Sequence, residues 1–153
     1  MEGISILERF PDDHSSKPVY LQAAGRSFSG DQRHVSIWWA NHDAPNLLVA
    51  QMMQLTGTPG VYRWESTGQI KDRVALESDD IYELGTYTRS QRDRMVELAG
   101  SIQFDSRSIV NGCRVWTHDL LKAMAADDEQ LLDAQLLAML VEEVPLPERR
   151  AEL

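Results

Sequence analysis

The stretch Arg33-His34-Val35-Ser36-Ile37-Trp38-Trp39-Ala40 is rich in β-branched and aromatic residues, a composition typical of a β-strand. On both sides of it the chain continues with short runs of similar residues, separated by turn-forming Gly, Pro, Asn and Asp. Further strands are predicted at residues 19–24, 61–66 and 81–87, with turns at 25–31, 41–46 and 56–60, and with Gly68 ending the strand before it. The run 47–55 has a composition that also permits a helix, but it is short and lies between two turns, which favours a strand.

The second half of the chain has helical periodicity. Thr88 and Gln91 form the Thr-x-x-Gln pattern of a capping box, and apolar residues at helical spacing follow it. A second helix is predicted to open at residues 111–112. A third is predicted to be capped at residues 127–128 and to end at Pro145. The apolar positions of the three helices are Met95, Leu98, Ala99 and Ile102; Cys113, Trp116, Leu120 and Met124; and Leu131, Leu132, Leu136, Met139 and Leu140.

Strands followed by helices predict an α+β fold, with about three helices packed on one side of a mostly antiparallel sheet. The 153 residues fit one domain, placed at residues 18–147. Residues 1–17 are predicted to be a flexible N-terminal arm with a short strand at 4–7, and residues 148–153 a C-terminal tail. The helix expected at 129–144 is apolar enough to bury a partner, which leaves a homodimer open.

Charge and composition narrow the classes of function. The formal net charge is −9, which argues against nucleic acid and against anionic membrane surfaces, because both are bound through Lys and Arg. No apolar run approaches the roughly 18 residues that span a bilayer, and the first residues lack the features of a signal peptide. A single cysteine allows no internal disulfide, so we expect a reducing compartment, the cytoplasm.

Cys113 is the first candidate for chemistry. It is expected at or near a helix N-terminus, where the helix dipole favours the thiolate, and a nearby imidazole could act as its base. Cys113 also falls on the apolar face of its helix with Trp116 and Leu120. Free cysteine is among the most buried residue types, so an inert core position is the competing interpretation.

His34 is the second candidate, because a histidine on a rigid strand is well placed to serve as a base. By period-two geometry it shares a face with Ser36 and Trp38. Arg63 and Glu65 share one face of a later strand, and either could orient His34 if the two strands pair; the alternative is an exposed ion pair of little energetic value. His118 lies about 140° round its helix from Cys113 and should not reach the same site.

Other kinds of site have little support in the sequence. Four scattered histidines and one cysteine have no metal-ligand spacing, and no nucleotide-binding glycine motif occurs, so neither a metal nor a cofactor is expected. The four tryptophans, Trp38, Trp39, Trp64 and Trp116, could line an apolar ligand pocket, although core packing is their more usual role.

The order of these pieces resembles a known group. A histidine opens an aromatic-rich strand, and a later helix begins at Asn111-Gly112-Cys113-Arg114-Val115-Trp116. This resembles the circularly permuted papain-like proteins, the NlpC-related group with the PPPDE and lecithin–retinol acyltransferase families. It is also similar to uncharacterised fungal domain families with a Gly-Cys-Arg-x-Trp motif. Two departures are visible: Gly112 separates Asn111 from Cys113, and Val35 stands where a tryptophan is common.

The resemblance implies a permuted papain-like fold in which Cys113 is the nucleophile and His34 the general base. A polar group on a neighbouring strand would orient the imidazole, and backbone N–H groups at the helix start would hold the oxyanion. Thiol-dependent hydrolysis or acyl transfer on a small amide or ester is the first hypothesis, with Asn111, Trp38 and Trp116 near the site. A non-catalytic domain that binds a small molecule or a protein is the second, and a tailoring isomerase or cyclase the third.

Overall fold

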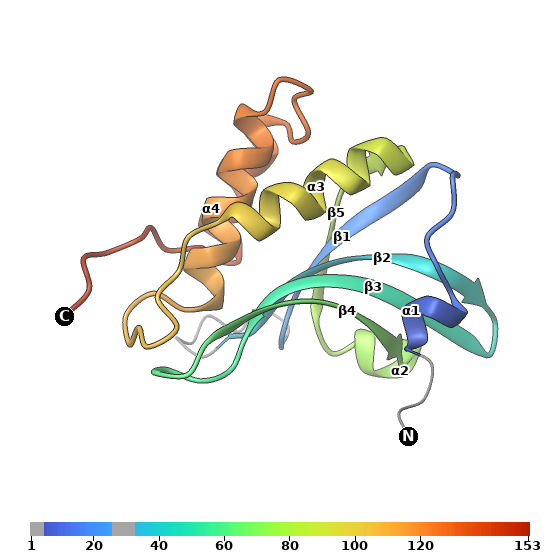
Figure 1. The fold of residues 1–153 in the computed structure, drawn as a ribbon, viewed down its shortest axis with the longest axis horizontal. Helices are drawn as coiled ribbons and strands as arrows, with labels where there is room; N and C mark the ends of the chain where they lie inside the picture. The colour runs from blue at the N-terminus through green and yellow to red at the C-terminus, as the bar shows by residue number, and fades with distance from the viewer. Residues whose placement is uncertain (1–4, 26–32) are drawn as a thin grey trace.

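The computed structural model describes residues 5–25 and 33–153, which form an α+β fold. Five antiparallel strands make one sheet in the order β4-β3-β2-β1-β5. Figure 1 shows α3 and α4 crossing one side of this sheet. The elements are α1 (Ile6–Arg9), β1 (Lys17–Ala23), β2 (Val35–Ala44), β3 (Leu47–Thr56), β4 (Arg63–Lys71), α2 (Arg73–Leu76), β5 (Asp80–Tyr87), α3 (Arg89–Ser101), α4 (Cys113–Ala126) and α5 (Ala134–Glu143).

The strands predicted between residues 19 and 87 are confirmed, and the run 47–55 is a strand, β3. Two boundaries were wrong. The turn expected at 41–46 is shorter, because β2 continues to Ala44 and pairs with β3 up to Leu47. Gly68 does not end β4, which runs on to Lys71. At Gly68 a Cβ would lie 2.3 Å from Ile6 Cγ2, so the glycine lets α1 approach the sheet closely. The turn expected at 25–31 lies outside the described residues apart from Gly25.

The helices follow the predicted periodicity, and the capping box of Thr88 and Gln91 is confirmed at the start of α3. The third helix begins later than expected. Asp133, not Asp127 or Asp128, caps α5 by accepting a hydrogen bond from Leu136 N. Asp127 instead follows α4, and its carboxylate accepts from the guanidinium of Arg94.

The main core lies between the sheet and the three long helices. Alternate residues of β2 and β3, such as Ile37 and Met53, face Trp116 and Leu120 of α4. The intervening positions face the other side of the sheet, where a smaller apolar cluster contains Trp38, Leu48, Ala50 and Met52 with Leu76 of α2 packed against it. Leu140 of α5 is fully buried in the main core, and Leu136, Leu137 and Met139 are partly buried against it.

The described part of the segment expected to be an arm, residues 5–17, is attached to the domain. The predicted strand at 4–7 was wrong, because Ile6–Arg9 is a helical turn. Asp12 accepts hydrogen bonds from Lys17 at 2.7 Å and from the buried Arg92 at 2.8 and 2.9 Å. Burial acts to raise the pKa of Asp12, but the hydrogen bonds from Arg92 and Lys17 outweigh it and lower the pKa.

No helix in the described part of the chain is long and apolar enough to cross a membrane.

Candidate active site

Cys113 is the first residue of α4, directly after the N-cap Gly112. The N-cap has no side chain that could accept from the first turn, and an α-helix leaves its first N–H groups without intrahelical acceptors. The thiol is half-buried, and Sγ lies 3.5 Å from the carbonyl oxygen of Arg33, which accepts its hydrogen bond. Cys113 is therefore placed at a helix start and within reach of the residue that precedes His34.

His34 directly precedes β2 rather than lying within it. Its Nε2 donates to Oε1 of Gln54 at 2.7 Å, which leaves Nδ1 as the ring nitrogen available to Cys113. The pKa of His34 is raised, chiefly by its hydrogen bond with Cys113; burial acts in the opposite direction, and the hydrogen bond with Gln54 raises it further. The structure thus brings the two candidate residues together.

Gln54 is a polar residue of this site that the sequence analysis missed. It lies on β3, is nearly buried, and is the direct partner of Glu65 on β4. Its side-chain amide donates to Glu65 Oε1 at 3.2 Å while its carbonyl holds His34. Glu65 in turn accepts from Arg63 Nε at 3.4 Å. Glu65 and Arg63 therefore do not touch His34 as expected, because β3 lies between β2 and β4, and Glu65 contacts Gln54 instead.

A register count would have pointed to Gln54. In the β2–β3 pair Ile37 lies opposite Met53, so Ser36 is level with Gln54 and His34 is its diagonal neighbour on the same face. The signal in the sequence is a glutamine near the end of a mostly apolar strand. It was overlooked because the length of the hairpin turn, and hence the register, was not known.

The position of His34 is set by Arg33, a second residue without a predicted role. Its guanidinium is buried and donates to Val144 O at 2.6 Å, to Ala24 O at 2.8 Å and to the carboxylate of Asp80. These partners belong to the end of α5, the end of β1 and the start of β5. Since several elements fix Arg33, its carbonyl faces Cys113 and the next side chain, His34, is directed to the same place.

The thiol and the imidazole open into a cavity of about 720 Å³. Its walls come from the loop before β4, the segment that leads into α4, and the C-terminal segment. Tyr62 closes one side: at Gly112 a Cβ would lie 2.7 Å from the Tyr62 hydroxyl, so the glycine makes room for the phenol. Burial raises the pKa of Tyr62, and the charge of Cys113 adds to the effect. The lining residues are His34, Gly57, Thr58, Pro59, Tyr62, Ile109, Val110, Gly112, Cys113, Arg114, Val115, Pro147 and Arg150.

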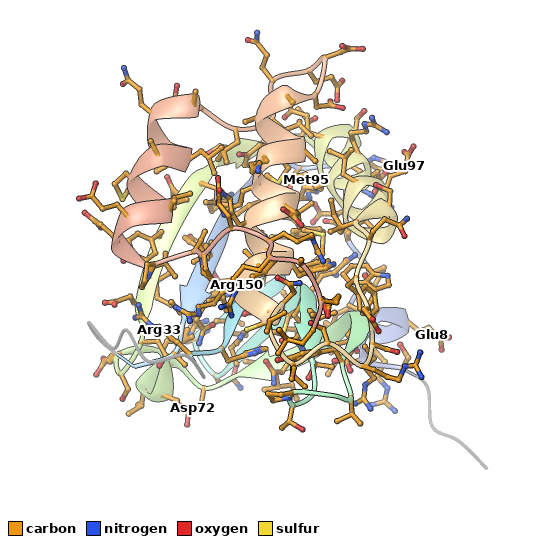
Figure 2. The ribbon with its side chains drawn as sticks, turned by 90° about the vertical axis from the view of Figure 1, so that its left-hand side faces the viewer. Glu8, Arg33, Asp72, Met95, Glu97 and Arg150 are labelled. Atoms are coloured by element: carbon orange, nitrogen blue, oxygen red, sulfur yellow. The ribbon has the colours of Figure 1, made fainter. Side chains whose placement is uncertain are left out.

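Asn111 lies one residue from the cavity lining but its side chain is used elsewhere. Its Oδ1 accepts from Arg150 N at 2.8 Å, and its Nδ2 donates to Arg150 O at 2.7 Å and to Glu152 at 2.6 Å. Asn111 therefore holds the C-terminal segment, which Figure 2 shows with Arg150 labelled. The segment expected to be a tail is thereby attached beside the candidate site.

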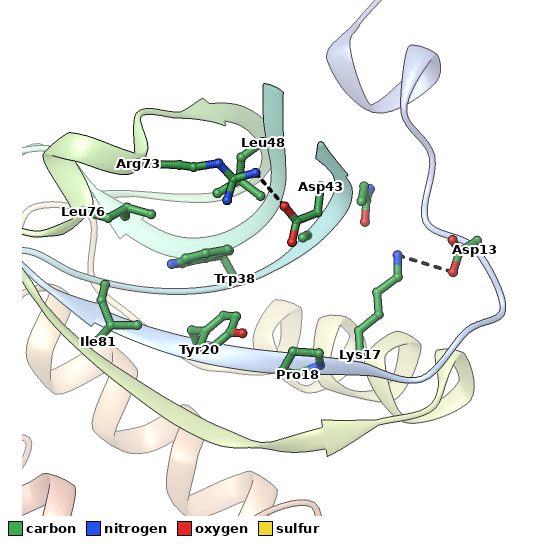
Figure 3. A pocket seen from close by; sticks show the side chains of 12 residues that line it. Asp13, Lys17, Pro18, Tyr20, Trp38, Asp43, Leu48, Arg73, Leu76 and Ile81 are labelled. Atoms are coloured by element: carbon green, nitrogen blue, oxygen red, sulfur yellow. Dashed lines mark hydrogen bonds and ion pairs between the residues drawn. The ribbon is translucent and has the colours of Figure 1, made fainter. Parts of the chain in front are cut away.

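The two tryptophans expected near the site lie elsewhere. Trp116 is buried in the main core, with its ring 5.2 Å from that of Trp64. Trp38 shares a sheet face with Gln54, but it lines a second cavity of about 490 Å³ beside Tyr20, shown in Figure 3. The expectation that they lie in the pocket of the site was wrong, because Trp116 is buried in the main core and Trp38 lies farther along β2. His118 also stays apart, with Nδ1 3.1 Å from Pro147 O.

The second cavity has an apolar floor and a charged rim. The rings of Tyr20 and Trp38 lie 4.9 Å apart at its centre. On the rim, Arg73 pairs with Asp43 at 2.6 Å and Lys17 with Asp13 at 3.5 Å, as Figure 3 shows. These charges are compensated within the protein.

Among the described residues, no group of three or more His, Cys, Asp or Glu side chains could hold a metal ion. No protein-family model matches the chain, and comparison with curated proteins and with solved structures gives no match either.

Proposed function

We propose that this protein is a thiol-dependent hydrolase or acyltransferase that acts on a small amide or ester. The observation that carries the proposal is the hydrogen-bonded series Glu65–Gln54–His34–Cys113, which ends at a helix start and opens into a cavity. A cysteine that only fills the core needs neither an imidazole beside it nor a cavity in front of it. The chain order, His34 before Cys113, also supports membership of the permuted papain-like group.

In the proposed mechanism His34 Nδ1 takes the thiol proton and the sulfur of Cys113 attacks the carbonyl carbon. A C–S bond forms and the carbonyl oxygen becomes an oxyanion, which first-turn N–H groups of α4 stabilise. The oxyanion then collapses, the bond to the leaving group breaks, and that group takes the proton from His34. Water or an acceptor alcohol or amine, activated by His34, attacks the thioester and releases Cys113.

Gln54 has the role of a positioning residue in this mechanism. Its carbonyl holds Nε2–H, which fixes the tautomer that presents Nδ1 to the thiol, as the third residue of a Cys-His-Asn site does. Glu65 prevents Gln54 from rotating, because it accepts from the other end of the same amide. The reaction needs no metal or cofactor, and its natural setting is the reducing cytoplasm, where the thiol stays free.

The test is to trap the acyl-enzyme. We expect p-nitrophenyl acetate to give a burst of nitrophenol and a mass increase of one acetyl group on Cys113, lost in Cys113→Ser and strongly slowed in His34→Ala. Acetylation spread over lysines, with no burst from Cys113, would contradict the proposal. Turnover that survives Cys113→Ala would instead support an isomerase or cyclase that does not use the thiol.

The second cavity favours one further candidate function, the binding of a small apolar molecule without catalysis. Tyr20 and Trp38 offer aromatic faces there, and Leu48, Leu76 and Ile81 add aliphatic walls. A cavity of this size can hold a small ligand. Binding of an aromatic probe such as 1-anilinonaphthalene-8-sulfonate that is lost in Trp38→Ala would support this function, and binding that is unchanged in Trp38→Ala would contradict it.

A further inference from the structure

The cavity at Cys113 is cationic in a protein whose formal net charge is −9. Arg114 and Arg150 are its charged lining residues, and His34 has a raised pKa. Among the described residues no aspartate or glutamate lines it. The chain as a whole carries an excess of negative charge. A cavity that is lined by arginine and by no described carboxylate differs from this average, and its local field attracts anions.

The backbone of Arg150 is held in place by Asn111, and its side chain makes one long hydrogen bond. Asn111 accepts from its N–H and donates to its carbonyl, as a neighbouring strand would. The guanidinium is exposed and donates only to Val110 O, at 3.4 Å, and it forms no ion pair with a described residue. Arg149, the residue before it, instead pairs with Asp119 at 2.8 Å.

Glu152, two residues after Arg150, forms no ion pair with it. Glu152 accepts hydrogen bonds from Ser108 Oγ at 2.8 Å and from Asn111 Nδ2 at 2.6 Å. Its carboxylate is therefore used to attach the segment to the loop before α4. The result is a fixed backbone at Arg150, which lines the cavity that holds the thiol and forms no ion pair with a described residue.

We propose that the substrate carries an anionic group, a carboxylate or a phosphate, beside the acyl group that Cys113 attacks, and that Arg150 binds it. This inference rests on the function proposed above and names its substrate class. A guanidinium presents parallel N–H donors that match two oxygens of a carboxylate or phosphate. The start of α4 lies on the same cavity wall, and its helix dipole adds to the field that favours an anion.

Two alkylating reagents of similar shape and different charge test the inference. Iodoacetate is anionic and iodoacetamide neutral; with each, the C–S bond forms at Cys113, the C–I bond breaks and iodide leaves. The ratio of the two rate constants reports the field at the thiol. We expect Arg150→Ala to lower the iodoacetate-to-iodoacetamide ratio about tenfold, within the range of electrostatic steering effects. Arg150→Lys should retain part of the preference, because it keeps the charge but loses the paired donors.

Lys122→Ala is the matched control, since Lys122 is an exposed cation on α4 and its removal changes the net charge equally. Its ratio should equal that of the unmodified chain. Succinate and inorganic phosphate are then added separately as protectants against iodoacetamide. Protection by succinate identifies a carboxylate substrate, and protection by phosphate a phosphorylated one; both should weaken in Arg150→Ala.

An unchanged reagent ratio in Arg150→Ala, with no protection by either anion, would overturn the inference. The proposed function would survive that result if iodoacetamide still reacted quickly and in a manner dependent on His34. Slow reaction with both reagents, unaffected by His34→Ala, would overturn the proposed function and this inference with it.

Discussion

Replacing Gln54 with leucine tests whether the side chain behind His34 controls the candidate site. The substitution removes the carbonyl that accepts from His34 Nε2 at 2.7 Å. It puts an apolar side chain of similar size in its place on β3. A hydrogen bond to a charged group contributes about 1.5–3 kcal/mol, and 1.36 kcal/mol corresponds to about one pKa unit. Because the hydrogen bond with Gln54 raises the pKa of His34, we expect its loss to lower that pKa by the equivalent of this energy.

The assay is an NMR titration of the His34 ring protons. It is performed in a Cys113→Ala background, so that the imidazole and the thiol do not titrate as a coupled pair. Gln69→Leu is the matched control, because Gln69 is exposed on β4 and its replacement should leave the His34 titration unchanged. The same pKa with and without Gln54 would refute the argument that this residue holds the imidazole.

The remaining predictions concern stability and the attachment of the C-terminal segment. Arg92→Leu should destabilise the fold by about 3–5 kcal/mol, measured by chemical denaturation, because it leaves the Asp12 carboxylate buried without its main partner. In the unmodified chain the lowered pKa of Asp12 means that its contribution is present above about pH 4 and is lost as the pH falls further; acid stability that does not depend on Asp12 would contradict this. Gly57→Ala should lower the melting temperature more than Gly60→Ala, since both have positive φ but only at Gly57 would a Cβ lie 2.3 Å from a backbone oxygen; equal losses would show that backbone strain alone decides. Asn111→Ala should increase proteolysis and amide exchange of residues 148–153 while the sheet stays protected, and unchanged protection would contradict the role given to Asn111.

The strands and helices could be predicted because local signals agree with the fold. The capping box at Thr88 and the apolar periodicity around Met95 each follow from short-range physical chemistry. Boundaries were less accurate where tertiary contacts decided them. Gly68 is a turn signal in isolation, but in the fold its missing side chain admits α1 against β4.

The candidate site was predictable only in part, because its residues are distant in the chain. His34 and Cys113 could be nominated by residue type and by their expected positions at a strand start and a helix start. Gln54 and Arg33 could not, since their roles depend on strand register and on the meeting of β1, β5 and α5. Trp38 was misassigned because aromatic composition does not say which of two cavities a side chain lines.

The most direct test of the account is the rate of Cys113 alkylation by iodoacetamide as a function of pH, in the unmodified chain and in His34→Ala. The account predicts fast alkylation at and below neutral pH that is lost in His34→Ala, because the imidazole hydrogen-bonded to the thiol takes its proton. Slow alkylation that becomes fast only when the chain is unfolded, with no difference between the two proteins, would contradict it and make Cys113 a structural residue.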